Sequence, residues 1–364
     1  MVATEPKYGA SAELPSTAEL EQITKIRDES RKEIDALTCN ADDITGDLRI
    51  CRFLRARHGN AKEAGDWFRQ FLRWRVSSGM DVDRQQVVGR SPEDFVAWFR
   101  KFKNPYLPFC PYAGRTSDGH VLMYMRQGRM DAQKFLEHRQ LPLKEDAKIM
   151  DLVLEWTLWH LNSLSRQENR MAYVIKVLDF RGLGADGRKL PIFVPGFKDF
   201  MSEMLKSQQK NYCDHDALFV MLNTPFAFRA VFAVIKLLLT KRQVAKIRIL
   251  GDASKADVRQ QLADLIPEDR LPLDYGGSLE EAPGAFPLHS AAEIEAWYRN
   301  RHLLPMEIVE SGDVAEAATT SLASADPPKA TTTEGSSLSL SKKDFEDPVQ
   351  QDVAIRPAGN YCCW

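Results

Sequence analysis

Two lysines stand where a bound anion would account for their charge. Lys176 lies in the apolar run Ala172 to Phe180, and alternation along a strand places it on the same face as Val174. Lys246 opens a second apolar run that ends at Leu250. A buried ammonium group without a partner is costly, so either each lysine reaches solvent at a sheet edge or both meet an anionic group of a ligand. The sequence leaves these two alternatives open.

Glycines with the spacing of a dinucleotide-binding fingerprint follow the first run, in the segment Gly182-Leu183-Gly184-Ala185-Asp186-Gly187. That fingerprint needs a helix directly after the third glycine, because the N-terminus of the helix holds the pyrophosphate. Pro191 and Pro195 follow instead and predict an irregular connection. A nucleotide-dependent oxidoreductase is therefore the minor alternative.

The segment Cys213-Asp214-His215-Asp216 gathers side chains that can bind metal ions. Neighbouring residues of a turn rarely converge on one ion, and no distant further ligand accompanies them. We interpret the segment as a solvated turn and expect no metal site. Because GxSxG, HExxH and GxxxxGK[ST] motifs are also missing from the sequence, we expect neither enzymatic chemistry nor a cofactor.

An apolar segment, Pro225 to Leu239, stands out among the elements that would position these residues. It is shorter than the roughly 20 residues that a membrane-spanning helix needs. It is therefore either a buried core helix or a helix between an apolar cavity and a membrane surface. Basic residues that could hold it to an anionic membrane are Arg229, Lys236, Lys241 and Arg242.

The composition excludes several classes of protein. A net charge of −2 over 364 residues argues against a nucleic-acid binder. The N-terminal sequence MVATEPKYGASAEL lacks the apolar core of a secretory signal, and the six cysteines show no CxxC spacing. We expect a monomeric, cytoplasmic protein with neither a zinc site nor a disulfide framework.

Helices are predicted throughout the N-terminal part. Ser16 and Glu19 predict a capping box that opens a helix from about Ala18 to Leu37. Two more are predicted at Leu48 to Arg57 and at Ala61 to Val76. In the first of these two, helical spacing places Arg57 on the apolar face. The same spacing predicts that the other arginines are solvated, namely Arg49, Arg52 and Arg55.

Predicted strands and helices alternate from Gly119 onward. The strands are Val121 to Met125, Ala172 to Phe180, Ala217 to Asn223 and Lys246 to Leu250, and the helices include Leu143 to Ser165 and Phe197 to Gln209. This alternation predicts an α/β domain with a largely parallel sheet. A last helix is predicted from Ser290 to Arg299, and the composition beyond Ser311 predicts a disordered tail.

Six segments occur in an order that is informative as a set. They are LRICRFLRARHGNAKEAGDWFRQFLRWR from Leu48, Asp118 to Val121, Val177 to Leu183, Asn223 to Phe228, Lys246 to Gly251, and Leu271 to Gly277. In this order they resemble the motifs of the CRAL-TRIO lipid-binding family, which includes the fungal phosphatidylinositol transfer protein. Chance similarity of six ordered motifs is improbable.

The resemblance implies an N-terminal helical module and a CRAL-TRIO domain whose mainly parallel sheet of five to six strands encloses one lipid under a mobile gate helix. The implied boundaries are a flexible N-terminus at 1–15, the helical module at 16–90, the lipid-binding domain at 91–283, a C-terminal helical extension at 284–310 and the tail at 311–364. The gate helix and acyl pocket would comprise Phe226, Phe228, Val231, Phe232, Ile235 and Leu239.

The resemblance also implies a headgroup site. Relatives that bind phosphatidylinositol carry a basic pair, a glutamate and a lysine where this chain has Arg57-His58, Asp214 and Lys246. Relatives that bind phosphatidylcholine use hydroxyl groups where this chain has Val174 and Lys176. Because Lys176 would repel a choline ammonium, we expect a phosphoinositide or another anionic phospholipid. Its headgroup would be bound by Arg57, His58, Lys176, Asp214 and Lys246.

We therefore expect a carrier that binds one membrane lipid, associates transiently with anionic membrane surfaces, and transfers or presents the lipid between membranes. The alternative from another class is a lipid-regulated scaffold or signalling module without net transfer.

Overall fold

The computed structural model describes residues 10–280 of the chain, except residues 105, 138–142, 185–190, 226–227 and 229–243. The chain divides into two compact units, Met1–Leu304 and Pro305–Trp364. All described residues belong to the first unit. The predicted helix at 290–299 and the predicted tail lie outside them, so the domain boundaries proposed from the sequence stay predictions.

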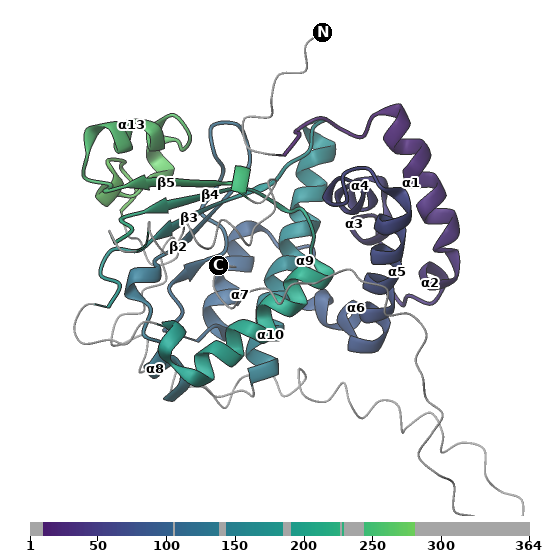
Figure 1. Cartoon of the computed structure of the whole chain (residues 1–364), viewed down its shortest axis with the longest axis horizontal. Helices are drawn as coiled ribbons and strands as arrows, with labels where there is room; N and C mark the ends of the chain where they lie inside the picture. Colours follow the sequence, from purple (N-terminus) through teal and green to yellow (C-terminus); the bar gives the residue numbers. More distant parts are fainter. Residues whose placement is uncertain are drawn as a thin grey trace, which may run out of the picture. The chain divides into compact units, whose positions relative to one another are not determined.

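A five-stranded sheet organises the described part of this unit (Figure 1). Its strands are β1 (Phe109–Cys110), β2 (Val121–Met125), β3 (Val174–Asp179), β4 (Asp216–Leu222) and β5 (Ile247–Gly251), and they lie side by side in chain order. β1 pairs antiparallel with β2, whereas all other neighbours are parallel. The predicted α/β fold with a mainly parallel sheet is confirmed.

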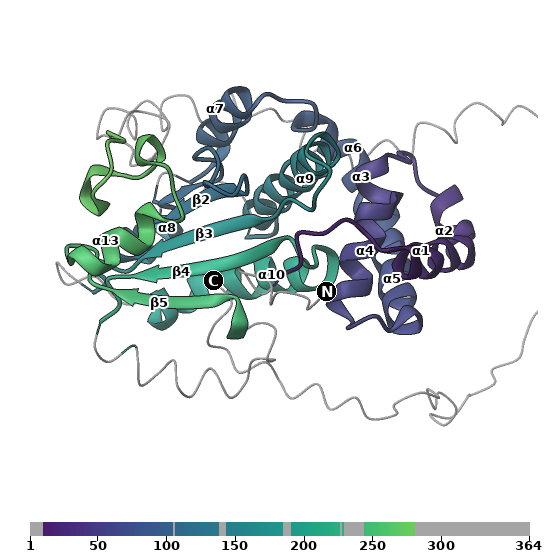
Figure 2. The same cartoon turned by 90° about the horizontal axis from the view of Figure 1, so that it is seen from above.

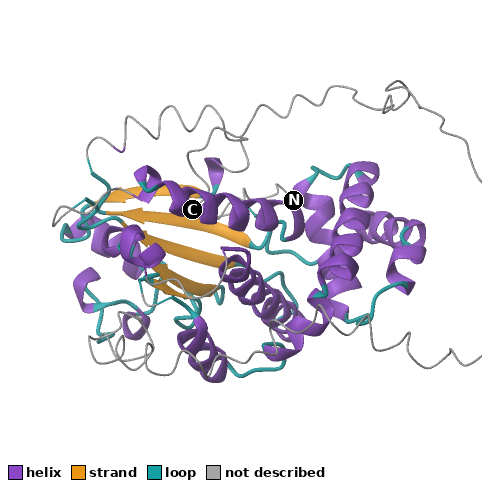
Figure 3. Cartoon of the chain, turned by 90° about the horizontal axis from the view of Figure 1, so that it is seen from below, coloured by secondary structure: helices purple, strands orange, loops and turns teal. Residues whose placement is uncertain are grey.

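Helices cover both faces of the sheet. Parallel strands in chain order carry their right-handed crossovers on one face. α8 (Ala132–Glu137), α9 (Leu143–Gln167) and α10 (Pro195–Asn211) accordingly lie on one side, and α13 (Ala256–Ala263) lies on the other (Figures 1 and 2). Seen from below, the helices of the larger layer cross in front of the strands (Figure 3).

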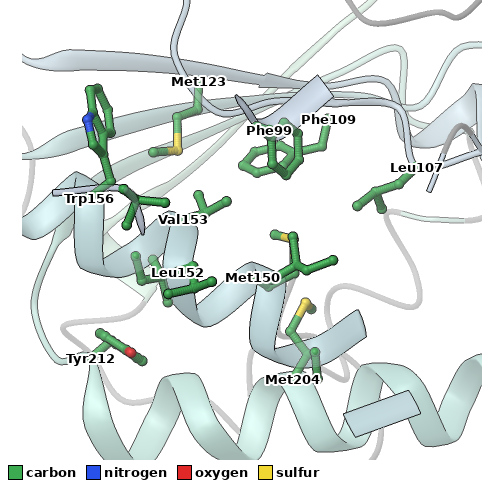
Figure 4. Close-up of a cluster of buried hydrophobic side chains, with 14 of the residues drawn as sticks. Phe99, Leu107, Phe109, Met123, Met150, Leu152, Val153, Trp156, Met204 and Tyr212 are labelled. Atoms are coloured by element: carbon green, nitrogen blue, oxygen red, sulfur yellow. The ribbon is translucent and has the colours of Figure 1, made fainter. Parts of the chain in front are cut away.

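The larger apolar core fills the space between the sheet and this helical layer. Met123 of β2 points toward α9, and Met204 of α10 lies next to Met150 of α9 (Figure 4). Phe95 of α7 (Pro92–Phe102) stacks on Trp156 of α9, with ring centroids 3.9 Å apart. Each such side chain contributes about 1.5–3 kcal/mol on burial, so this layer holds the sheet in place.

The N-terminal module consists of α1 (Thr17–Glu29), α2 (Arg31–Asp35), α3 (Asp42–Thr45), α4 (Asp47–Ala56), α5 (Ala61–Ser78) and α6 (Met80–Asp83). The capping box of Ser16 and Glu19 is present. The first helix is not continuous as predicted, because Ser30 takes a non-helical conformation between α1 and α2. Short 3₁₀ turns complete the described elements: η1 (Arg84–Gln86), η2 (Gln127–Arg129), η4 (Pro191–Phe193), η5 (Glu268–Arg270) and η6 (Leu273–Tyr275).

A buried ion network fastens this module to α9. Arg75 and Arg84 donate to the two carboxylate oxygens of Glu155, over 2.7 and 2.9 Å. Tyr212 donates to the same carboxylate over 3.0 Å. Burial raises the pKa of Glu155, but the charges of Arg75 and Arg84 outweigh it, so the pKa lies below its ordinary value. The carboxylate is therefore charged and fully partnered at neutral pH.

Candidate functional site

Three predicted headgroup residues meet near the amino ends of β4 and β5. Nζ of Lys246 lies 2.8 Å from Oδ1 of Asp214, and Nζ of Lys176 lies 3.0 Å from Oδ2 of Asp216. Nε2 of His215 lies 3.2 Å from the same oxygen of Asp216. We call these five residues the lysine–aspartate cluster. The structure thus brings Lys176, Asp214 and Lys246 together, and their binding of a headgroup stays a prediction.

The cluster faces the helical layer that covers the larger core. The strand register places Lys176 between Met123 of β2 and Phe219 of β4, and Met123 belongs to that core. The side chains of Asp214 and Lys246 are only 2% and 9% exposed. The sequence left open whether the lysines reach solvent or meet an anionic ligand. In the structure each lysine is instead paired with a carboxylate of the chain itself.

The charges of the cluster are balanced. Burial, helped by the nearby lysines, lowers the pKa of His215 to about 4 against the opposing effect of Asp216, so the imidazole is neutral at neutral pH. Burial raises the pKa of Asp216, but His215 and Lys176 outweigh it and hold the pKa below its ordinary value. Two ammonium groups therefore face two carboxylates, and a ligand must compete with or share these pairs.

Asp216 and His215 were not predicted as site residues, and the segment Cys213 to Asp216 is not the solvated turn expected from the sequence. Cys213 and His215 are buried, and Cys213 packs in an apolar cluster with side chains of the N-terminal module. Burial raises the pKa of the Cys213 thiol to about 12. The sequence did contain an indication of Asp216, because a lysine that points inward from one strand favours a carboxylate on the neighbouring strand. No group of three or more potential metal ligands occurs among the residues that the structure describes.

Arg57 and His58 lie at the end of α4 and are exposed. The guanidinium of Arg57 lies over the ring of Trp67, 4.4 Å from its centroid. His58 has a left-handed backbone, with φ of 53°. The prediction that Arg57 lies on the apolar face of this helix is wrong, because the helix ends at Ala56, one residue earlier than predicted. Their part in headgroup binding stays a prediction.

The prediction that the other arginines of α4 are solvated is wrong. Arg49 and Arg52 are each 3% exposed. Arg52 donates to the carbonyl oxygens of Asp214 and Ala172, over 2.9 and 2.7 Å. Arg49 donates to the carbonyl of Asn211 over 2.9 Å. Carbonyl groups at a helix C-terminus and before a strand lack the hydrogen-bond donors of regular secondary structure. The buried arginines supply these donors.

Arg55 is also turned away from solvent. Its guanidinium pairs with the carboxylate of Glu19, over 2.7 Å. This pair is the largest cause of the lowered pKa of Glu19, about 2. Helical periodicity alone could not show this contact, because the partner lies on another helix.

Hydrogen bonds fix the chain just before the predicted gate helix. Asp179 accepts from Asn223 and from the hydroxyl of Tyr275, each over 2.7 Å. Asn223 in turn accepts from the backbone amide of Ala253 over 2.9 Å, and its φ is 52°. The carboxyl ends of β3 and β4 are thereby tied to the segments that follow β5.

Only Phe228 of the predicted gate and acyl pocket is described, and its ring centroid lies 5.0 Å from that of Phe180. The other gate and membrane-contact residues lie outside the described residues, namely Phe226, Val231, Phe232, Ile235, Leu239, Arg229, Lys236, Lys241 and Arg242. Within the described ranges, no helix is both long and apolar enough to cross a membrane.

A family model of the CRAL/TRIO domain matches residues 108–277. These residues form a CRAL/TRIO domain. The matched range contains all five strands and the whole lysine–aspartate cluster. The observed sheet and its helical layers are consistent with the fold of this family.

Several known proteins are similar to this CRAL/TRIO protein over most of its length. The Sec14 cytosolic factor of Schizosaccharomyces pombe is 25% identical over 270 residues, which cover 72% of this chain and 85% of the relative. The SEC14 cytosolic factor of Eremothecium gossypii is 24% identical over 294 residues, covering 79% and 84%.

Two further similarities extend this set. The phosphatidylinositol/phosphatidylcholine transfer protein SFH7 of Arabidopsis thaliana is 22% identical over 236 residues, covering 63% of this chain and 38% of that protein. The crystal structure of Sfh5 is 12% identical in sequence, with a TM-score of 0.46 and coverage of 80% of this chain and 99% of Sfh5.

Proposed function

We propose that this CRAL/TRIO protein binds one membrane phospholipid, with a phosphoinositide or other anionic headgroup at the lysine–aspartate cluster, and transfers or presents it between membranes. Support comes from the similarity to Sec14 factors and to a protein named for transfer of phosphatidylinositol and phosphatidylcholine. The proposal includes transient association of a cytoplasmic, monomeric protein with anionic membranes. It includes no enzymatic step and no cofactor other than the lipid.

The observation that carries the headgroup assignment is the mixed chemistry of the cluster. The ammonium groups of Lys176 and Lys246 donate hydrogen bonds, and the carboxylates of Asp214 and Asp216 accept them. An inositol phosphate offers phosphate oxygens to the lysines and hydroxyl donors to the aspartates. A choline headgroup has no hydrogen-bond donor for a carboxylate. Arg57 and His58 would also bind the headgroup.

Selectivity must come from this headgroup contact. Burying acyl chains stabilises a lipid by about 0.8 kcal/mol per methylene, but a bilayer offers the same stabilisation. Exchange between protein and membrane is therefore nearly balanced for the chains. The difference between one phospholipid and another lies in what the headgroup gains or loses on leaving the membrane surface.

The test is transfer of fluorescent phosphatidylinositol and phosphatidylcholine between vesicles. We expect the wild-type chain to accelerate transfer of phosphatidylinositol. The paired variant Lys246→Met with Asp214→Asn should lose the preference for phosphatidylinositol, whereas Lys206→Met, an exposed residue of α10, should not. Lipid that is bound tightly and never exchanged would contradict the carrier proposal and support a lipid-regulated scaffold.

A further inference from the structure

Arg52 contacts the segments that directly precede two neighbouring strands. Its two terminal nitrogens donate to the carbonyls of Ala172 and Asp214, which stand two residues before β3 and two residues before β4. Its guanidinium also lies over the ring of Tyr173, 4.9 Å from the centroid. A planar fork that is held at two carbonyls and against an aromatic face has one orientation.

Asp214 is the residue through which this contact reaches the headgroup site. Its backbone is left-handed, with φ of 51°, a conformation that residues other than glycine adopt only when their surroundings impose it. Its carbonyl is held by Arg52, while its carboxylate pairs with Lys246. Lys246 also donates to the carbonyl of Asp216 over 2.7 Å. The orientation of one peptide unit thus decides where the ion pair lies.

We propose that Arg52 is a positioning residue of the headgroup site: by holding the carbonyl of Asp214, the N-terminal module sets the geometry of the Asp214–Lys246 pair and hence the choice of headgroup. This inference rests on the proposed function and assigns a specificity role to a residue outside the matched CRAL/TRIO range. Arg52 itself touches no headgroup.

Arg49 offers a matched control on the same helix. It lies one turn earlier, is equally buried, and also donates to a main-chain carbonyl, that of Asn211. Asn211 ends α10 and lies three residues before Asp214. Arg49→Lys and Arg52→Lys therefore remove a comparable buried guanidinium and keep the charge, but only Arg52→Lys releases the carbonyl of Asp214.

The experiment incubates full-length variants with vesicles of equal parts phosphatidylinositol and phosphatidylcholine, then quantifies both lipids bound per chain. For Arg52→Lys we expect the ratio of bound phosphatidylinositol to phosphatidylcholine to fall about tenfold, the scale of one hydrogen bond to a charged group, with total occupancy unchanged. Arg49→Lys should keep the wild-type ratio. Asp214→Asn should shift the ratio as Arg52→Lys does, and combining the two should add little.

Equal changes of the ratio in Arg49→Lys and Arg52→Lys would overturn the inference, because they would show a general effect of loosening α4. An unchanged ratio in Arg52→Lys beside a changed ratio in Asp214→Asn would also overturn it, while leaving the proposed function standing. If the wild type binds both lipids equally and Asp214→Asn leaves the ratio unchanged, the proposed headgroup site is contradicted, and with it the role of Arg52.

A measurement on the wild-type chain guards against a variant that does not fold. The side-chain NMR signals of Arg52 should differ between protein loaded with phosphatidylinositol and protein loaded with phosphatidylcholine, and those of Arg49 should not. Identical Arg52 signals in the two loaded states would contradict a link between this guanidinium and the headgroup.

Discussion

Lys246 and Asp214 each depend on the other, because both side chains are almost fully buried. Replacing Lys246 with methionine removes the lysine that pairs with a buried carboxylate, and breaking such a pair typically destabilises a protein by about 3–5 kcal/mol. The double variant Lys246→Met with Asp214→Asn removes both charges and should recover most of this loss. Urea denaturation of the wild type, of Lys246→Met and of the double variant measures their free energies of unfolding.

Lys206→Met, on the surface of α10, controls for loss of a lysine as such and should be nearly neutral. A double variant that is as unstable as Lys246→Met alone would show that the pairing is not what stabilises these groups.

The inward lysines could be predicted from residue patterns, but which carboxylate each of them meets could not. Alternation along β3 correctly placed Lys176 on an inner face. The carboxylate that it meets belongs to β4, and strand register is not written in either strand alone. The buried positions of Arg49 and Arg52 were missed for a related reason: their acceptors are backbone carbonyls, which carry no side-chain signal in a sequence.

Asp151 makes the packing of α9 on α10 sensitive to pH. It accepts a hydrogen bond from Ser207 of α10 over 2.8 Å, and Lys148 and Glu155 are the nearby charged groups of its own helix. Burial raises the pKa of Asp151 to about 7. The folded chain therefore binds a proton more tightly than the unfolded chain, and this contribution to stability is lost as pH rises from about 4 through about 7.

Asp151→Asn should remove that loss, so the variant should gain stability relative to the wild type at about pH 8, by at most about 4 kcal/mol, and match it at about pH 4. His215, with a pKa lowered to about 4, acts in the opposite direction between about pH 4 and 6.5 in both proteins and cancels in the difference. Denaturant titrations at several pH values give this difference, and a difference independent of pH would contradict the assignment.

Glu155 of α9 pairs with arginines of α5 and η1, so it should stabilise the packing of these two elements on α9. In Glu155→Gln each arginine loses one of its two buried carboxylate partners, while Asp81 still pairs with Arg75 and Asp43 with Arg84, so the cost is at most about 3–5 kcal/mol. We expect faster hydrogen exchange in α5 and in η1, where Arg75 and Arg84 lie. Glu203→Gln, at the surface of α10, should leave that exchange unchanged. Unaltered exchange in Glu155→Gln would show that apolar packing alone holds the module.

At the scale of the whole molecule, the fold was accessible from the sequence and the site only in part. Alternating apolar runs and helical periods are local signals, and they predicted the four parallel strands and the helices α9 and α10 to within a few residues. The ordered motifs predicted the family, and the domain match confirms it. The short antiparallel strand β1 was missed, because two residues are too few for a periodic pattern.

The proposed function requires that each chain binds one phospholipid with an anionic headgroup. Native mass spectrometry of the full-length chain from a eukaryotic host, followed by lipid extraction, tests it most directly, since it reports occupancy and headgroup together. We expect a mass increase of a single phospholipid per chain, identified as a phosphoinositide or another anionic phospholipid. A chain that carries no lipid, or only a neutral hydrophobic molecule such as a sterol, would contradict it.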